Sequence, residues 1–226
     1  MNETQIKRRA ELLLQLESAQ RRLAEGSEGG SVRALEEIAQ RLHALAVEVD
    51  ATSCDMLERV RNWRYLADAY MDIAGVQASE QFKEALAFYK RADALMEGVE
   101  NSRERMLLEY GFGRALLGMV RCGDLSVVDD VGQRFARAQA IARFQAPELN
   151  ELIRRALMHL QVIANLIEER RDLWRRIDQR ERCRQISEPS DLDKYPESSE
   201  DAALFERLLE VCERMAQVRA CDVQRH

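Results

Sequence analysis

The chain has 226 residues, of which 46% are hydrophobic and 33% charged, and its formal net charge is -6. This apolar content excludes a disordered chain, and the presence of only 3 Pro and 10 Gly favours helix throughout. Because no stretch approaches the ~20 apolar residues that span a bilayer and the N-terminus lacks an apolar signal core, we expect a cytoplasmic protein without a membrane partner.

The first hairpin is predicted over residues 3–50. Apolar residues recur at helical spacing over 3–24, before the break at Glu25–Gly30. Ser31 can then cap a second helix that runs to about Asp50.

Two further hairpins are predicted at about 53–98 and 102–144. Polar residues that cap helices precede each apolar-periodic segment, and Gly123–Asp124 supplies the turn inside the last hairpin. The candidate caps are Thr52 or Ser53, Ser79, Asn101 or Ser102, and Ser126.

A long helix is predicted after the third hairpin. Pro147 suits a first helical turn, and no breaker follows until Pro189, which permits one helix of up to ~40 residues. Its first part is expected to cap the array, giving one domain over 1–168. The second region, 169–226, then holds the extended helix, an acidic linker that begins near Ser187, and a C-terminal helix.

A small–aromatic–small signature recurs three times at a constant interval of 46 residues. Its members are Ala39, His43 and Ala46; Ala85, Tyr89 and Ala92; and Val131, Phe135 and Ala138. A fixed period indicates modules that bury their apolar faces by stacking on their neighbours. The sequence therefore predicts an all-α fold of three stacked helical hairpins followed by a long capping helix and a C-terminal helix.

The second hairpin carries a recognisable motif: Trp63, Leu66, Ala67 and Tyr70, and then Ala85, Tyr89 and Ala92. It resembles a tetratricopeptide repeat, and the third hairpin is a degenerate match. The resemblance covers about Ile6 to Phe144, although the period of 46 exceeds the usual ~34 and no proline follows each second helix. It implies a right-handed solenoid whose first helices line a concave groove for an extended peptide.

The resemblance also implies which side chains face this groove. They are Arg61, Arg64, Asp68 and Met71 in the second hairpin, and Arg114, Leu117 and Arg121 in the third. The arginines among them could bind an acidic peptide or a C-terminal carboxylate through bidentate contacts. The alternative is an ordinary solvated helix face.

The C-terminal helices offer a second candidate interface. The long helix extends past the core of the array and leaves Trp174 and Ile177 in need of a partner, while the last helix carries a seam that includes Leu208 and Met215. The last helix could fold back on the Trp174 region or pair with a second chain in a homodimer. The sequence leaves both arrangements open.

Catalytic, metal and cofactor sites find no support in the sequence. The three histidines lie far apart, the five cysteines are widely spaced, and no nucleotide-binding or hydrolase motif is present. Acidic residues interleave the arginines around Trp174, which is typical of a solvated ion-paired helix and not of a nucleic-acid site. We therefore predict a non-catalytic scaffold, adaptor or regulator that binds a protein segment. The alternative is a self-assembling structural or chaperone-type protein that acts through its C-terminal helices.

Overall fold

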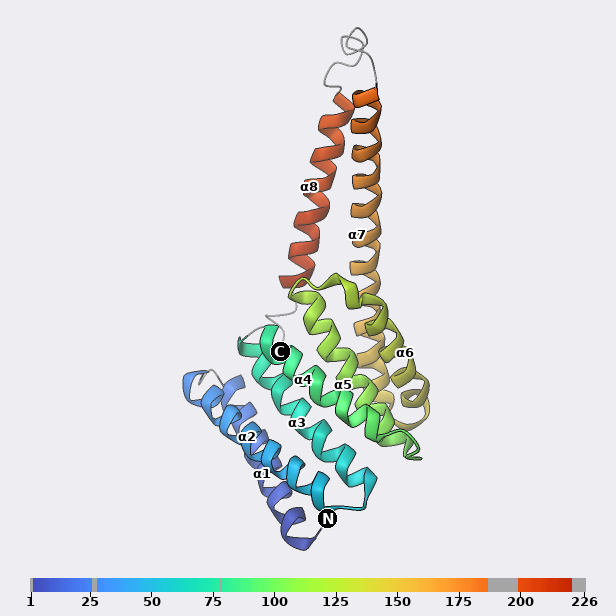
Figure 1. Cartoon of the computed structure of the whole chain (residues 1–226). Coiled ribbons are helices and arrows are strands. Elements are labelled where there is room, and N and C mark those ends of the chain that lie inside the picture. The colour runs from blue at the N-terminus through green and yellow to red at the C-terminus, as the bar shows by residue number, and fades with distance from the viewer. Residues whose placement is uncertain (1, 26–27, 78, 187–198, 221–226) are drawn as a thin grey trace. The chain divides into compact units, whose positions relative to one another are not determined.

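The computed structural model describes residues 2–25, 28–77, 79–186 and 199–220, and within them all regular structure is helical (Figure 1). A short 3-10 turn, η1 (Leu125–Val127), precedes the sixth α-helix. The α-helices are α1 (Glu3–Ala24), α2 (Glu28–Thr52), α3 (Met56–Gln77), α4 (Ser79–Leu95), α5 (Ser102–Arg121), α6 (Val128–Gln145), α7 (Pro147–Ile186) and α8 (Ser199–Ala220). The prediction of an all-α protein is confirmed for these residues, and the expected acidic linker lies outside them.

The starts of α5 and α6 show how capping side chains determine where a helix begins. The side chain of Asn101 caps α5 as predicted, since its Oδ1 accepts a hydrogen bond of 2.9 Å from the backbone N–H of Glu104. At the start of α6, Ser126 does not act as the cap. Asp124 Oδ1 accepts from both the backbone N–H (3.1 Å) and the hydroxyl (2.6 Å) of Ser126, and α6 begins at Val128 after the 3-10 turn.

The described chain divides into two compact units, one up to Leu157 and one from Met158 onward. The first unit contains α1 to α6 and the beginning of α7, whereas the second contains the remainder of α7 together with α8. The division thus falls inside a continuous helix and precedes the boundary predicted at residue 168. No helix in the described ranges is both long enough and apolar enough to cross a membrane.

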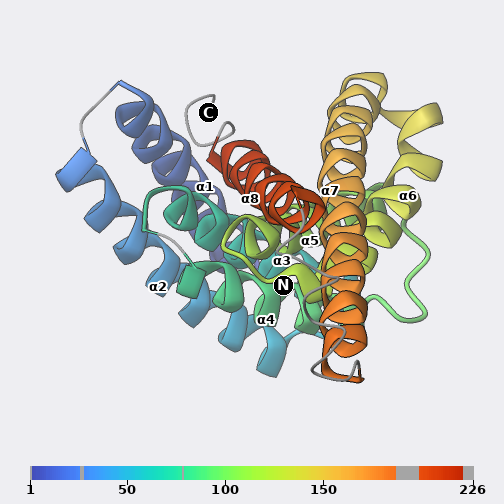
Figure 2. The same ribbon diagram turned by 90° about the horizontal axis from the view of Figure 1, so that it is seen from above.

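The first unit is built from three successive antiparallel hairpins, α1–α2, α3–α4 and α5–α6 (Figures 1 and 2). Each helix contacts the next along the chain, and α3 also contacts α5. Gln20 Nε2 donates a 2.6 Å hydrogen bond from α1 to Asp72 Oδ2 of α3, and Arg91 of α4 donates one of 2.5 Å to Asp50 of α2. The first helices of the hairpins therefore form one layer and the second helices the other.

The residues of the 46-residue signature form much of this core. The small members of all three repeats are buried, and so are the aromatic members Tyr89 and Phe135. His43 is the exception to the expected pattern because it remains exposed, although its ring lies 6.0 Å from that of Trp63 and 5.6 Å from that of Phe88. A polar imidazole can stay hydrated at the edge of the aromatic cluster at little cost.

Close packing of α5 against α4 and α6 depends on glycine. A Cβ atom on Gly111 of α5 would lie 2.5 Å from the hydroxyl oxygen of Tyr89, and one on Gly113 would lie 2.9 Å from the ring of Phe135. Both buried rings thus occupy space that any larger residue would fill. This contact fixes α5 between α4 and α6.

The second unit is an antiparallel helical hairpin of α7 and α8. Ile177, Leu208 and Met215 are buried, and Arg207 Nη2 of α8 lies 2.6 Å from Glu169 Oε1 of α7. The last helix therefore folds back on the long helix within one chain. Trp174 stays 53% exposed.

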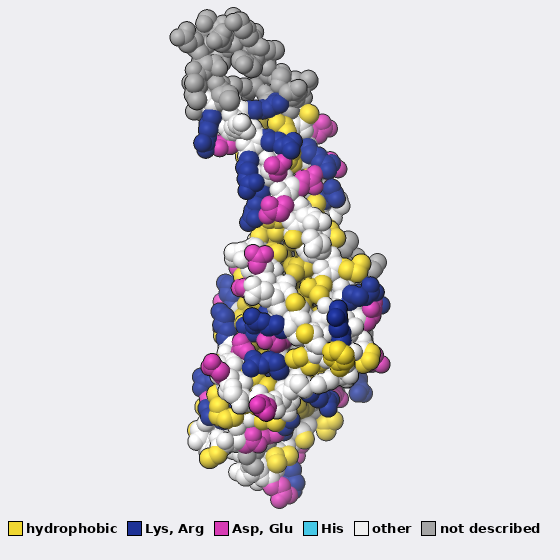
Figure 3. Space-filling view, turned by 90° about the vertical axis from the view of Figure 1, so that its right-hand side faces the viewer, with side chains coloured by type: hydrophobic (Ala, Val, Ile, Leu, Met, Phe, Trp, Pro, Cys, Tyr) yellow, Lys and Arg dark blue, Asp and Glu magenta, His cyan; other side chains and the backbone are white. Residues whose placement is uncertain are grey.

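Charged side chains of both signs alternate over the hairpin near the undescribed linker (Figure 3). Arginines of α7 pair with acids one turn away at 2.7–2.8 Å. These pairs are Arg171 with Glu168, Arg176 with Asp172, and Arg182 with Asp178.

Candidate functional site

The seven residues predicted to line the groove form a surface that we call the α3–α5 face. They are Arg61, Arg64, Asp68, Met71, Arg114, Leu117 and Arg121. The structure exposes Arg114 but buries Met71 and Leu117, and the two apolar side chains are therefore not open to a partner. Three of the charged members, Arg61, Arg64 and Asp68, are connected by a network of ion pairs.

Arg64 lies at the centre of this network and is only 7% exposed. Its Nε donates to Glu104 of α5, its Nη1 donates to Asp68 Oδ2 at 2.6 Å, and its guanidinium lies 4.4 Å from the ring centroid of Tyr65. Burial lowers the pKa of Arg64, but the charges of Asp68 and Glu104 outweigh that effect and raise the pKa above its ordinary value. Arg64 is therefore a permanently charged side chain whose charge is neutralised inside the protein.

Arg61 continues the network toward α1. Its Nη1 donates to Glu58 Oε1 at 2.7 Å and its Nε donates to Glu104 Oε2 at 3.4 Å, while Arg9 of α1 pairs with the other oxygen of Glu58. Burial raises the pKa of Glu58, but hydrogen bonds from Arg9 and Arg61 lower it by more, with a net shift downward. The positive charges of Arg61 and Arg64, which were expected to help hold an acidic peptide, are thus matched by carboxylates of the same chain.

Asp72 extends the polar contacts of α3 by one turn. Its carboxylate accepts the hydrogen bond from Gln20 of α1, and burial together with the nearby charge of Asp68 raises the pKa of Asp72 to about 6. Asp68 also accepts a 2.5 Å hydrogen bond from the hydroxyl of Tyr89. The α3–α5 face is therefore a set of contacts between repeats.

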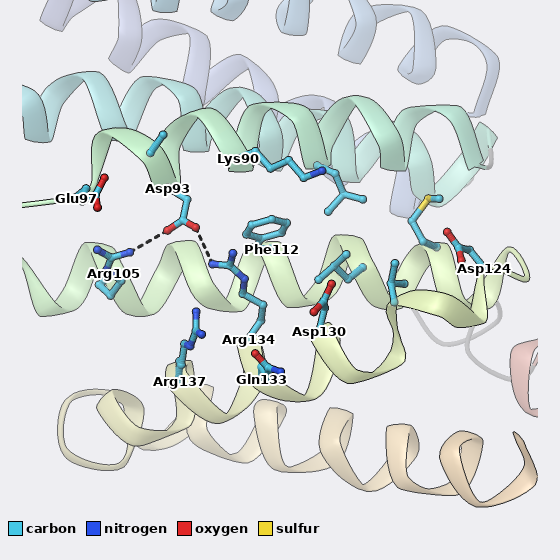
Figure 4. A pocket seen from close by; sticks show the side chains of 15 residues that line it. Lys90, Asp93, Glu97, Arg105, Phe112, Asp124, Asp130, Gln133, Arg134 and Arg137 are labelled. Atoms are coloured by element: carbon cyan, nitrogen blue, oxygen red, sulfur yellow. Dashed lines mark hydrogen bonds and ion pairs between the residues drawn. The ribbon is translucent and has the colours of Figure 1, made fainter. Parts of the chain in front are cut away.

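An open cavity lies elsewhere in the first unit, between α4 and α6 and above α5 (Figure 4). We call it the α4–α6 trough. Its volume is about 830 Å³. It is lined by Leu86, Lys90, Asp93 and Ala94 of α4; Glu97 of the turn after α4; Arg105, Phe112, Leu116 and Met119 of α5; and Asp124, Val127, Asp130, Gln133, Arg134 and Arg137 from the next turn and α6.

Asp93 joins the two walls of the trough. It lies 2.9 Å from Arg105 of α5 and 2.9 Å from Arg134 of α6 (Figure 4). Arg134 also lies 3.9 Å from the ring centroid of Phe112 and 3.0 Å from the buried carboxylate of Glu109. This cluster closes the space over Phe112 and divides the trough into two parts.

Charged residues of opposite sign line the two walls on either side of this cluster. Because Asp93 is level with Arg134 and the two helices run in the same direction, Lys90 is level with Asp130 (Figure 4). Glu97 lies beyond the end of α4, on the side of Arg105 (Figure 4). Among the described residues, neither Lys90 nor Glu97 nor Asp130 has an ion-pair partner within 4.0 Å. These side chains remain open to a partner.

The part of the trough that contains Lys90 and Asp130 has an apolar floor. Leu86 and Leu116 are buried there, whereas Met119 is half-buried. An apolar floor with charged walls can bind a side chain of another molecule, but it holds no nucleophile next to a base. Within the described ranges, no group of three or more His, Cys, Asp and Glu residues could hold a metal ion.

Sequence reasoning missed the trough because its residues are spaced like an ordinary helix face. On α4 they recur at intervals of four and three from Leu86 to Asp93, and on α5 at the same intervals from Phe112 to Met119. The available signal in the sequence was the occurrence of such stripes both on the second helix of one hairpin, α4, and on the first helix of the next, α5.

The chain has no match among known protein families, characterised proteins or solved structures.

Proposed function

We propose that the protein is a non-catalytic interaction scaffold that binds a segment of a partner protein in the α4–α6 trough. The observation that carries the proposal is the cavity of about 830 Å³ between two hairpins, with an apolar floor and open charges on both walls. Protein interfaces combine an apolar centre with a polar rim in the same way.

The dimensions of the trough suit a peptide segment. Its lining on α5 extends from Arg105 to Met119, 15 residues whose 14 steps cover about 21 Å at 1.5 Å per residue. An extended peptide of about six residues, or a helix of about four turns, has this length. A partner segment could therefore contact α4, α5 and α6 at once.

A tetratricopeptide-like architecture is part of the proposal. Successive two-helix modules and buried small and aromatic repeat positions support it. The resemblance alone would place the partner on the first helices. We place it between the second helices instead, because the charges of Arg61 and Arg64 are neutralised within the chain.

The test compares partners captured from a lysate of the source cell by the wild type and by Met119→Glu, which puts a carboxylate on the apolar floor. Met158→Glu is the matched control, since Met158 is exposed and lies outside the trough. Arg114→Glu changes the exposed charge of the α3–α5 face. Circular dichroism establishes that each variant is folded.

We expect quantitative mass spectrometry to find at least one protein that Met119→Glu loses and that both other variants retain. Addition of that protein should slow hydrogen exchange in α4, α5 and α6 of the wild type. A partner that is lost only with Arg114→Glu would return the binding site to the α3–α5 face and contradict the proposal.

Self-association through the α7–α8 hairpin is a second candidate function. Trp174, Phe205 and Leu209 are 53%, 50% and 65% exposed, even though another apolar stripe of the hairpin is buried. A second copy of the chain would offer the same apolar surface across a two-fold axis. Light scattering of the wild type and of the variant Trp174→Ser/Leu209→Ser tests this candidate, and a monomeric wild type would reject it.

A further inference from the structure

We infer that the α4–α6 trough selects a partner segment in which an apolar side chain is flanked by basic residues. The inference rests on the proposed function and concerns the part of the trough between the Asp93–Arg134 pair and Asp124. In this inference the floor contacts the apolar side chain, and the carboxylates of Asp124 and Asp130 contact the basic ones.

The floor of this part accepts an apolar group. Leu86 approaches from α4, Leu116 and Met119 from α5, and Val127 from the end of the 3-10 turn. On one side the floor ends at Phe112, over which Arg134 is held by Asp93. An apolar side chain that entered here would remove apolar surface of both molecules from water.

The charges around this floor favour a cation. Asp130 is exposed on the α6 wall, and Asp124 is half-buried with one carboxylate oxygen engaged by Ser126. Lys90 on the α4 wall supplies the single opposing positive charge. Two carboxylates against one ammonium group leave an excess negative charge at this end, and the chain's net charge of -6 has the same sign.

The cations at the other end of the trough do not offset this preference. Arg105 and Arg134 share the carboxylate of Asp93, and Arg134 also pairs with Glu109. Glu97 adds a further carboxylate there and Arg137 a further guanidinium. The charges at that end are balanced, and an acidic segment would find no excess positive charge.

The test measures binding of three labelled peptides of about ten residues to the full chain by fluorescence anisotropy. Each peptide carries a central Leu-Leu pair, which is flanked by Arg, by Ser or by Glu. We expect the Arg-flanked peptide to bind about tenfold more tightly than the Glu-flanked peptide, with a difference that shrinks as salt is added.

Two aspartates of α6 give a matched pair of variants. Asp130 lines the trough and Asp129 does not, although both are exposed in the first turn of the helix. Asp130→Lys should abolish or reverse the preference for the Arg-flanked peptide, whereas Asp129→Lys should keep it. Met119→Glu should weaken binding of the Ser-flanked peptide, and this loss would show that the peptide binds in the trough.

The outcomes separate the inference from the proposed function. Tighter or equal binding of the Glu-flanked peptide, with sensitivity to Met119→Glu, would overturn the basic preference and leave the trough as a binding site. If no peptide binds in a manner that depends on Met119, both the inference and the proposed site are wrong. An identical loss with Asp129→Lys and Asp130→Lys would show that only the overall charge matters, and that would also overturn the inference.

Discussion

The α3–α5 face and the α4–α6 trough are both places where charged side chains from neighbouring repeats meet, yet only the trough is open. On the face, Arg64 and Glu104 come together from α3 and α5 and are both buried. In the trough, Lys90 and Asp130 are level across the cavity but form no ion pair. The face therefore links neighbouring repeats, whereas the charges of Lys90 and Asp130 on the trough walls remain without an ion-pair partner among the residues that the structure describes.

The difference follows from which helices are in contact. α3 touches α5 directly, and side chains between them are shielded from water. α4 and α6 are both in contact with α5, which keeps their walls apart except where Asp93 reaches Arg134. A buried charge without its partner costs several kcal/mol, whereas an exposed charge costs little.

Among the substitutions that test this comparison, Glu104→Gln should lower the free energy of unfolding the most. It leaves the buried guanidinium of Arg64 with Asp68 as its remaining ion-pair partner, and we expect the free energy of unfolding to fall by about 3–5 kcal/mol. Urea denaturation followed by circular dichroism measures the loss. Glu100→Gln, at an exposed position just before α5, should change stability by less than about 0.5 kcal/mol.

Arg134→Met should have a smaller effect, because it breaks a cluster that is only partly buried. The buried Glu109 loses its 3.0 Å partner but keeps Arg137 at 3.9 Å, and a loss of about 2 kcal/mol in the free energy of unfolding is expected. Arg137→Met is the control, with an expected change below about 0.5 kcal/mol. Equal losses for the two variants would show that Arg134 does not hold the trough together.

Asp72→Asn tests the polar contacts of α3 through their dependence on pH. Since the pKa of Asp72 is raised to about 6 in the folded state, protonation favours folding, and this contribution is complete below about pH 4 and is lost as the pH rises through 6. Asn resembles the protonated carboxyl group. The variant should therefore match the wild type below pH 4 and exceed its free energy of unfolding by about 3 kcal/mol at pH 7.

Urea titrations at pH 4, 5, 6 and 7 measure this difference. Asp129→Asn serves as the control, because Asp129 is exposed on α6. A difference between Asp72→Asn and the wild type that stays constant with pH would mean that Asp72 does not titrate in this range.

Much of the fold could be predicted from the sequence because the determining signals are local. The expected helices and the helices of the structure agree closely, and Asn101 caps α5 as its side chain suggests. The start of α6 was missed because Asp124 competes with Ser126 for the same turn. His43 was expected in the core because the repeat places it there, but its polar ring stays exposed.

The candidate sites were harder to predict because they depend on contacts between residues distant in sequence. Arg64 and Glu104 are 40 residues apart, and nothing in either segment indicates that they meet. The trough similarly brings together Lys90 and Asp130, because of the way α4 and α6 are staggered along their axes. Helix periodicity identifies the face of each helix but does not determine its register against a neighbour.

The smallest effect is expected for the charges of the trough walls, and it tests whether the cavity is open in solution. Lys90→Glu should change the free energy of unfolding by no more than about 0.5 kcal/mol, and Lys83→Glu on the same helix gives the reference for a surface lysine. Asp130→Lys carries an additional helix-dipole cost, which Asp129→Lys shares. In a double-mutant cycle, the coupling between Lys90→Glu and Asp130→Lys should therefore be close to zero. A coupling of about 1 kcal/mol or more would mean that these two side chains pair with each other across the cavity, in which case the trough closes on itself as the α3–α5 face does.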